Sequence, residues 1–268
     1  MLNQRYPGGL IGSPGVKDHD RLETEFGTYA EWLAQAIASL SFEDPIPAAC
    51  RGTGNPALFE RLADLLEAGP DVTVLDVGCG IGGPGAWLMR ERGCRVVGVD
   101  LMQPSLRGLK LLFPEFRTVR ASTGALPFTT DAFERAWMLG VLEIVADKRR
   151  ALAELQRVIQ PGGRVVIYTF VKTGDDLDEV PEADVFERAE FVTGCASDVG
   201  FGVRSAQPVT DIPKIPDGWR DVTSRVRGRL WELHANDPLL ERVELDLARI
   251  SRLTRSREVE PWEFVLEK

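Results

Sequence analysis

Short apolar runs alternate with amphipathic stretches through the middle of the chain. The apolar runs are rich in Val, Leu and Ile, as in strands that are buried on both faces of a parallel sheet. Strands are expected at 72–78, 95–100, 116–121, 134–139 and 163–170. Apolar residues at helical spacing between them predict helices at 84–92, 104–112 and 148–159. This alternation predicts an α/β fold with a Rossmann-like, doubly wound sheet of mostly parallel strands.

The segment before this core is expected to be helical. An aromatic stripe at helical spacing consists of Phe26, Tyr29 and Trp32. A second helix is expected to begin at Asn55-Pro56, as a cap followed by a first-turn proline, and to end at Gly69. In the same way, Pro161-Gly162-Gly163 is expected to end the helix that precedes the fifth strand.

Beyond residue 170 the apolar period becomes long and helical. Two helices are expected, followed by a short closing strand in PWEFVLEK. The first carries Val222, Val226, Leu230 and Leu233, and the second carries Leu240, Val243, Leu247, Ile250 and Leu253. The chain is therefore expected to have four parts: an N-terminal arm and lid helix, a nucleotide-binding core, the C-terminal part of the core with an inserted helical cap, and a last strand. Their bounds are 1–55, 56–170, 171–260 and 261–268.

Charge and composition limit the cellular locations and the kinds of partner that are expected for this protein. The chain has 41 acidic and 32 basic residues, a net charge of −9 that disfavours nucleic acid as a partner. The arginine-rich stretch 220–257 is interpreted as a solvated helix face, with an anionic substrate or partner as the alternative. No run of about 18 apolar residues suggests a membrane span, and the first residues do not resemble a signal peptide. We expect a cytoplasmic protein.

The four cysteines suggest neither a metal site nor a disulfide framework. Cys50, Cys79, Cys94 and Cys195 are far apart and form no CxxC pair, and the chain has only two histidines. Four reduced, mostly buried thiols are therefore expected, and no metal.

The stretch VLDVGCGIGGPGAWL, residues 74–88, runs from an apolar strand through a glycine-rich loop into a helix. Its spacing fits two ligands, a dinucleotide and a nucleoside attached to methionine. Asp100, at the end of the second strand, could bind ribose hydroxyls of either one. Asp76 at the start of the loop would repel a pyrophosphate and attract an ammonium, which favours S-adenosylmethionine as the cofactor.

Several stretches together resemble the class I S-adenosylmethionine-dependent methyltransferases. VLDVGCGIGG is similar to the first motif of that family, and VVGVD to its ribose-binding second motif. The segment from ALPF to GGRVVI resembles the third-to-fifth-strand region of the small-molecule branch, which includes sterol, quinone and natural-product methyltransferases. The resemblance covers about residues 56–170 and implies a seven-stranded sheet that ends in an antiparallel C-terminal strand.

The resemblance also implies cofactor contacts. The backbone of Gly78, Cys79 and Gly80 would lie along the methionine end, with the Cys79 side chain packed under the loop. Leu101 would lie against the adenine, Ser122 and Thr123 at its edge, and the Leu139 backbone near the ammonium. Two departures stand out. Ser122 replaces the usual acid, and Glu143-Ile144 replaces a frequent Glu-His.

Methyl transfer needs close alignment and a dry pocket more than a special residue, although an oxygen or carbon acceptor can need a base. The candidates are Glu143, Tyr29, His234 and His19. We therefore expect a metal-independent methyltransferase that acts on an O, N or C atom of a small molecule, and that could form a homodimer. The alternatives are a protein of this fold used for non-methylating chemistry or binding, and an NAD-dependent oxidoreductase.

Overall fold

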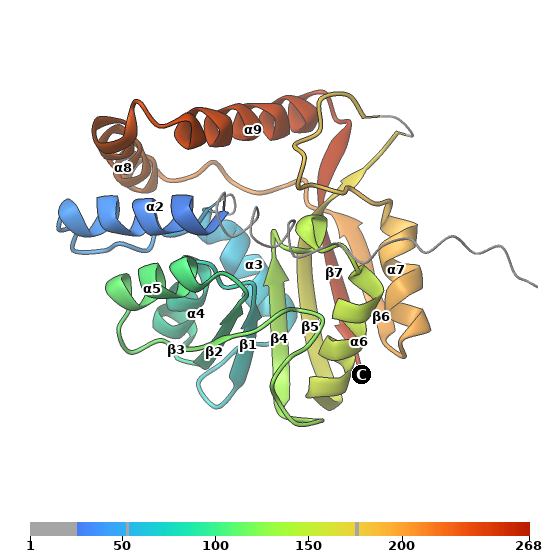
Figure 1. The fold of residues 1–268 in the computed structure, drawn as a ribbon. Coiled ribbons are helices and arrows are strands. Elements are labelled where there is room, and N and C mark those ends of the chain that lie inside the picture. The colour runs from blue at the N-terminus through green and yellow to red at the C-terminus, as the bar shows by residue number, and fades with distance from the viewer. Residues whose placement is uncertain (1–25, 52–53, 175–176) are drawn as a thin grey trace, which may run out of the picture.

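A computed structural model describes residues 26–51, 54–174 and 177–268, built on one seven-stranded sheet of order β3-β2-β1-β4-β5-β7-β6 (Figure 1). The strands are β1 (Thr73–Val77), β2 (Arg95–Asp100), β3 (Arg117–Arg120), β4 (Phe133–Leu139), β5 (Ile159–Lys172), β6 (Gly202–Pro208) and β7 (Val259–Glu267). β7 is antiparallel to both of its neighbours, and the other pairs are parallel. The predicted fold class is confirmed, including the antiparallel C-terminal strand. The expected N-terminal arm and His19 lie outside the described residues.

Helices cover both faces of the sheet. One face carries α3 (Pro56–Leu66), α4 (Gly83–Arg92) and α5 (Gln103–Leu112), and the other carries α6 (Lys148–Val158) and α7 (Ala189–Asp198). The strand order reverses between β1 and β4, because successive crossovers leave this pair in opposite directions along the sheet. Ligands of such sheets bind at the carboxyl ends of the strands beside this reversal.

A third group of helices lies across those carboxyl ends (Figure 1). It consists of α2 (Thr28–Ser39), α8 (Asp217–His234) and α9 (Pro238–Arg255). Their facing side chains form a separate apolar cluster that includes Leu33, Val226 and Leu240, and Ile81 of the glycine loop joins it. The N-terminal helix and the inserted helical pair therefore pack on each other and on the loop. None of the helices in the described ranges is long and apolar enough to cross a membrane.

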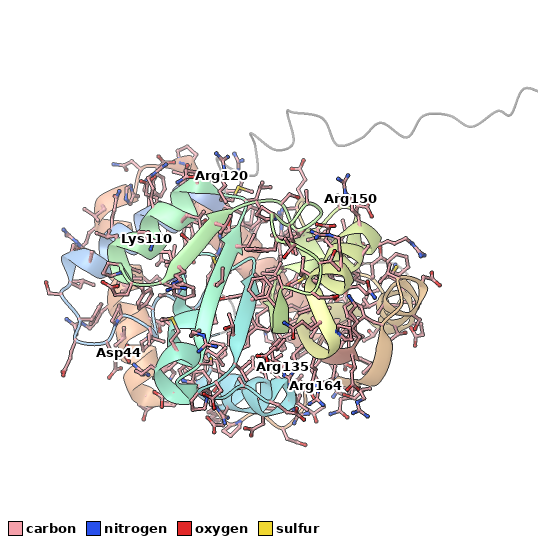
Figure 2. All side chains as sticks on the ribbon, turned by 90° about the horizontal axis from the view of Figure 1, so that it is seen from below. Asp44, Lys110, Arg120, Arg135, Arg150 and Arg164 are labelled. Atoms are coloured by element: carbon pink, nitrogen blue, oxygen red, sulfur yellow. The ribbon has the colours of Figure 1, made fainter. Side chains whose placement is uncertain are left out.

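The residues predicted to stop two of the helices were wrong. α3 ends at Leu66, and Glu67 rather than Gly69 takes the left-handed conformation, with φ 56°. The left-handed residue lets the N–H of Ala68 donate to the carbonyl of Ala63 at 3.0 Å, which closes the helix without a glycine. The Glu67 carboxylate also lies 3.2 Å from Arg135 on β4 and 2.7 Å from Arg164 on β5, the two arginines labelled in Figure 2.

The second stop signal concerns α6, whose predicted end at residue 159 is itself confirmed to within one residue. This helix ends at Val158, three residues before Pro161, because Ile159 already pairs with Phe133 in the sheet. The glycines that follow are part of β5 instead. Gly162 adopts φ +77° and donates its N–H to the carbonyl of Lys268, at 2.7 Å. Pairing with the C-terminal residue, which is remote in sequence, therefore decides the conformation of this turn.

Two carboxylates are buried inside the sheet, and only one has full hydrogen-bond compensation. Glu263 on β7 is fully buried and accepts hydrogen bonds from Arg61 Nε at 2.6 Å, Arg61 Nη2 at 2.5 Å and Gln207 Nε2 at 2.7 Å. This network joins α3, β7 and β6. Asp76 on β1 is 3% exposed, and its Oδ2 has no hydrogen-bond partner among the described residues. Burial raises the pKa of Asp76 to about 7, while the facing indole of Trp137 opposes the rise.

Replacing Arg61 by alanine is expected to lower the free energy of unfolding by about 3 kcal/mol, because it leaves the Glu263 carboxylate buried without its cation. Urea unfolding at pH 7 measures this loss. Arg95→Ala is the matched control, since Arg95 is an exposed arginine that bonds only Thr73 and a backbone carbonyl, and it should change the value by less than about 1 kcal/mol. Equal losses in the two variants would contradict a structural role for the Arg61–Glu263 pair.

Asp76→Asn is expected to change how stability depends on pH. Because the pKa of Asp76 is raised in the fold, its contribution to stability is largest below the unfolded pKa of about 4 and is lost as pH rises toward 7. The asparagine variant lacks this loss. The unfolding free energy of the variant minus that of the wild type should therefore be larger at pH 8 than at pH 5. The measurement is urea unfolding of both proteins at these two pH values. An unchanged difference would mean that Asp76 is not neutralised in the fold.

Candidate functional site

The glycine loop joins β1 to α4 and is tied to the end of β2. The N–H groups of Gly78 and Cys79 donate to the carbonyl of Val99, at 2.7 and 3.0 Å. The N–H of Gly80 donates to Oδ2 of Asp100 at 2.9 Å. The loop is therefore held at the carboxyl edge of the sheet, beside the reversal of strand order.

Most glycines of the loop are required by packing. A Cβ atom at Gly78 would lie 2.3 Å from the Val141 side chain, and one at Gly82 would lie 2.8 Å from Leu109. Gly80 is different, because a Cβ there would meet nothing within 4 Å. Gly80 thus faces open space, and its φ of +53° favours glycine. Within the loop, this is the position where a ligand could touch bare backbone.

Asp100 lies next to this open space and keeps acceptor capacity. Its two carboxylate oxygens accept one backbone N–H each, from Gly80 at 2.9 Å and from Met102 at 2.8 Å. Burial raises the pKa of Asp100, and these backbone hydrogen bonds oppose the rise. Each oxygen can accept a further hydrogen bond, so the half-buried carboxylate could hold two neighbouring hydroxyl groups.

Asp76 lies deeper than its sequence position suggested. It pairs in register with Trp137 on β4, and a Cβ at Gly85 would lie only 2.6 Å from its Oδ2. The carboxylate is therefore enclosed between the sheet and the first turn of α4. An ammonium near Asp76, contacted directly or through water, stays an expectation, and this enclosure favours the contact through water.

The remaining cofactor candidates come together at the same edge. Cys79 is buried, and a Cβ at Gly98 would lie 2.7 Å from its Sγ, so its side chain packs under the loop. Leu101 and Leu139 are half-buried after β2 and at the end of β4. Ser122 and Thr123 follow β3, where Ser122 Oγ accepts the Gly124 N–H at 3.2 Å in a turn. Four strand ends thus bring all these residues together.

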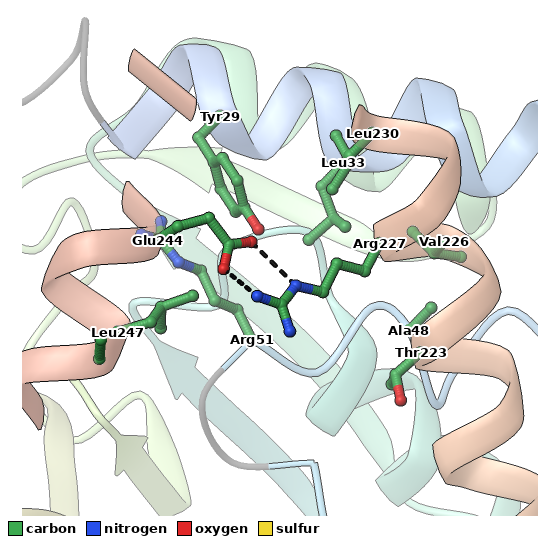
Figure 3. A pocket seen from close by; sticks show the side chains of 11 residues that line it. Tyr29, Leu33, Ala48, Arg51, Thr223, Val226, Arg227, Leu230, Glu244 and Leu247 are labelled. Carbon is green, nitrogen blue, oxygen red and sulfur yellow. Dashed lines mark hydrogen bonds and ion pairs between the residues drawn. The ribbon is translucent and has the colours of Figure 1, made fainter. Parts of the chain in front are cut away.

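A pocket of about 370 Å³ lies between α2, α8 and α9 (Figure 3). Its walls are mostly apolar, with Leu33, Val226, Leu230 and Leu247 among the lining residues. Its polar groups are Tyr29, Thr223, Arg51 and the ion pair of Arg227 with Glu244. The size is within the usual range for small-molecule sites.

Tyr29 is the catalytic candidate that lines this pocket. Its residue is 7% exposed, and its hydroxyl has no hydrogen-bond partner in the part of the chain that the structure describes. Burial raises the pKa of Tyr29, although the neighbouring Arg51 opposes the rise. The phenol is therefore neutral at pH 7 and can donate a hydrogen bond into the pocket.

Glu143 and His234 do not line the pocket. Glu143, in the short helix after β4, is 7% exposed and accepts a hydrogen bond from Thr169 Oγ1 at 2.6 Å. Burial raises its pKa to about 7, and the Thr169 hydrogen bond opposes this. His234 stacks on Trp32, with ring centroids 3.9 Å apart and an interplanar angle of 10°. Such contacts are typical of a histidine that contributes to packing.

The sequence analysis missed Arg51, Arg227 and Glu244. Arg227 and Glu244 lie on two helices that were expected, but their meeting across the pocket depends on how those helices pack. Arg51 lies in a link with no periodic pattern and carried no signal. Within the described ranges, no cluster of three or more His, Cys, Asp or Glu could hold a metal ion.

Comparisons with known proteins find similarity to methyltransferases. The family described as methyltransferase domain matches residues 75–167. The chain is 33% identical over 134 residues to methyltransferase GfsG of Streptomyces halstedii, which is 48% of each protein. It spans about half the length of the curated relatives that it matches first.

Solved structures show the same fold. A geranyl diphosphate C-methyltransferase from Streptomyces coelicolor A3(2), in complex with S-adenosyl-L-homocysteine, superposes with a TM-score of 0.68 at 18% identity, over 96% of this chain and 99% of that one. The [4+2]-cyclase SpnF superposes with a TM-score of 0.65 at 18% identity, over 90% and 94%. The fold alone therefore does not decide the chemistry. The sequence match to the methyltransferase domain covers residues 75–167, the segment that holds the glycine loop and Asp100.

Proposed function

We propose that this protein transfers a methyl group from S-adenosylmethionine to an O, N or C atom of a small molecule. The observation that carries the proposal is the pairing of Gly80 with Asp100, within the segment that matches the methyltransferase domain. Bare backbone beside open space and a carboxylate with spare acceptor capacity suit a ligand that has both a nucleoside diol and an amino-acid end.

The charges at the edge favour this cofactor over a dinucleotide. Asp76 and Asp100 both lie near the glycine loop, and two carboxylates would oppose a pyrophosphate there. We assign the ribose hydroxyls to Asp100, the methionine end to the backbone at Gly80, and the adenine to the side of Leu101 and Ser122. A cationic ligand above Asp76, whose pKa burial raises to about 7, would in turn favour the charged form of this carboxyl group.

S-adenosylmethionine supplies an electrophilic methyl group on a cationic sulfonium. The protein contributes position and exclusion of water, which in model reactions account for roughly 7–11 kcal/mol of a barrier. The apolar cluster of α2, α8 and α9 supports this role, because it covers the carboxyl edge of the sheet. Since the Tyr29 phenol stays protonated at pH 7, we propose that it orients the acceptor by donating a hydrogen bond and does not act as a base.

We further propose a natural-product intermediate as the acceptor and the cytoplasm as the location. The first proposal is supported by the sequence likeness to methyltransferase GfsG, found in a Streptomyces species, and by motifs of the small-molecule branch. The second is supported by four free, buried cysteines, which fit a reducing compartment. Homodimer formation is a separate expectation, which the mass of the purified protein in solution would test.

Calorimetric titration tests the cofactor. The wild type is expected to bind S-adenosylmethionine and not NAD. Asp100→Ala should weaken this binding by roughly 1.5–3 kcal/mol, about 10- to 150-fold, because it removes hydrogen bonds to a charged group. Gly80→Val should weaken it as well, since its side chain would fill the open space beside the loop.

The matched control is Asp198→Ala, which removes an exposed carboxylate paired with Arg149 and should leave the affinity unchanged. Binding of NAD by the wild type would refute the proposal in favour of an oxidoreductase. Unchanged S-adenosylmethionine affinity in both Asp100→Ala and Gly80→Val would show that the cofactor lies elsewhere.

Hydrogen exchange tests whether α2 acts as a lid. On addition of S-adenosylhomocysteine, the amides of residues 28–39 should exchange more slowly, because a lid closes more tightly over a bound ligand. The amides of β4, residues 133–139, provide the internal reference and should change little. If α2 is equally protected with and without ligand, it is a fixed part of the core and the lid proposal fails.

A further inference from the structure

Arg51 stands out among the pocket residues because aromatic rings hold it in place. Its guanidinium carbon lies 4.9 Å from the ring centroid of Phe26 and 4.8 Å from that of Tyr29. Cation–π contacts of this kind are favourable and hold the guanidinium beside the two rings. They use none of its five N–H donors, which therefore remain available for a ligand.

The charge of Arg51 is not neutralised by direct pairing within the described ranges. The other pocket arginine, Arg227, is bound to Glu244 across the gap between α8 and α9 (Figure 3). Arg51 forms no hydrogen bond or ion pair with any described residue, and Asp184 and Asp246 affect it only from beyond ion-pair distance. An accessible guanidinium in an apolar pocket is suited to an oxyanion, which it can bind through two parallel hydrogen bonds.

The link that carries Arg51 also contacts the cofactor loop. A Cβ at Gly83 would lie 2.5 Å from the carbonyl carbon and oxygen of Ala49, so the link packs on the first turn of α4. Ala48, the residue before Ala49 in this link, lines the pocket. One short segment therefore touches the start of α4 with its backbone and presents Arg51 to the pocket.

We infer that this pocket binds the methyl acceptor, and that the acceptor is an apolar molecule with an oxyanion, such as a carboxylate or a phosphate, which Arg51 holds. Only the role of the bound molecule as methyl acceptor rests on the proposed function. The binding site and its preference for an oxyanion are independent of it. Leu33, Val226, Leu230 and Leu247 contact the apolar body, and Tyr29 donates a further hydrogen bond.

Two fluorescent probes with the same apolar body test this directly. 1-Anilinonaphthalene-8-sulfonate carries an oxyanion, and N-phenyl-1-naphthylamine lacks it. In fluorescence titrations of the full chain, Arg51→Met should weaken binding of the sulfonate about tenfold or more and change the neutral probe by less than about twofold. Ala248→Trp, at an exposed lining position of α9, should weaken both probes because it fills the pocket.

The matched control is Arg225→Met. Arg225 also stacks on a ring, with its guanidinium carbon 4.7 Å from the Phe42 centroid, but it does not line the pocket. This variant should bind both probes as the wild type does. Displacement of the sulfonate probe by decanoate or by decyl phosphate, with decanol as the neutral comparison, distinguishes a carboxylate from a phosphate as the preferred group.

Three results would overturn the inference. The first is an equal effect of Arg51→Met on both probes, and the second is unchanged binding of the sulfonate in Arg51→Met. The third is competition between S-adenosylhomocysteine and the sulfonate probe, which would assign Arg51 to the carboxylate of the cofactor. Calorimetry with S-adenosylmethionine on the same samples separates failure of the proposed function from failure of this inference, because probe selectivity does not depend on cofactor binding.

Discussion

The reversal of strand order between β1 and β4 is the constraint on which the rest of the structure depends. Because the crossovers on its two sides lead to opposite directions along the sheet, the carboxyl ends of these two strands remain open between them. The glycine loop follows one of these strands, and Leu139 ends the other. The hydrogen bond from Gly80 to Asp100 then fixes the loop against the next strand, β2. The candidate site follows from this arrangement.

Close packing explains more of the glycine loop than ligand binding does. Gly78, Gly82 and Gly83 are needed because Val141, Leu109 and Ala49 occupy the space that a side chain would take. This density keeps the loop rigid, so that Gly80 is presented in one conformation. A loop that is rigid for internal reasons costs little entropy when it binds a ligand. The same packing places the link that carries Arg51 against the start of α4, which brings the pocket close to the cofactor edge.

The buried carboxylates differ in whether a cation is paired with them. Asp76 and Glu143 are enclosed carboxylates whose pKa values burial raises to about 7, and neither is paired with a cation at contact distance in the described ranges. Glu263 shows the alternative, since it is equally buried but is held by Arg61 and Gln207 and joins three elements of the fold. The paired carboxylate stabilises the sheet, whereas the unpaired Asp76 lies beneath the edge where a cation is expected to bind. Asp76 and Glu263 are thus both buried carboxylates on one sheet, but their hydrogen-bond partners give them different roles.

The sequence by itself determined the sheet class, the positions of the glycine loop and of the acids Asp76 and Asp100, and the match to the methyltransferase domain over residues 75–167. These features are local, because apolar period, glycine spacing and strand-end acids act within about a dozen residues. The tertiary structure decided what depends on distant partners. Glu67 at the end of α3 pairs with Arg135 and Arg164 from two strands, and Asp76 is enclosed because α4 packs over it. The pocket exists only where α2 meets the remote pair α8 and α9 beside Arg51, and no local pattern encodes such a meeting.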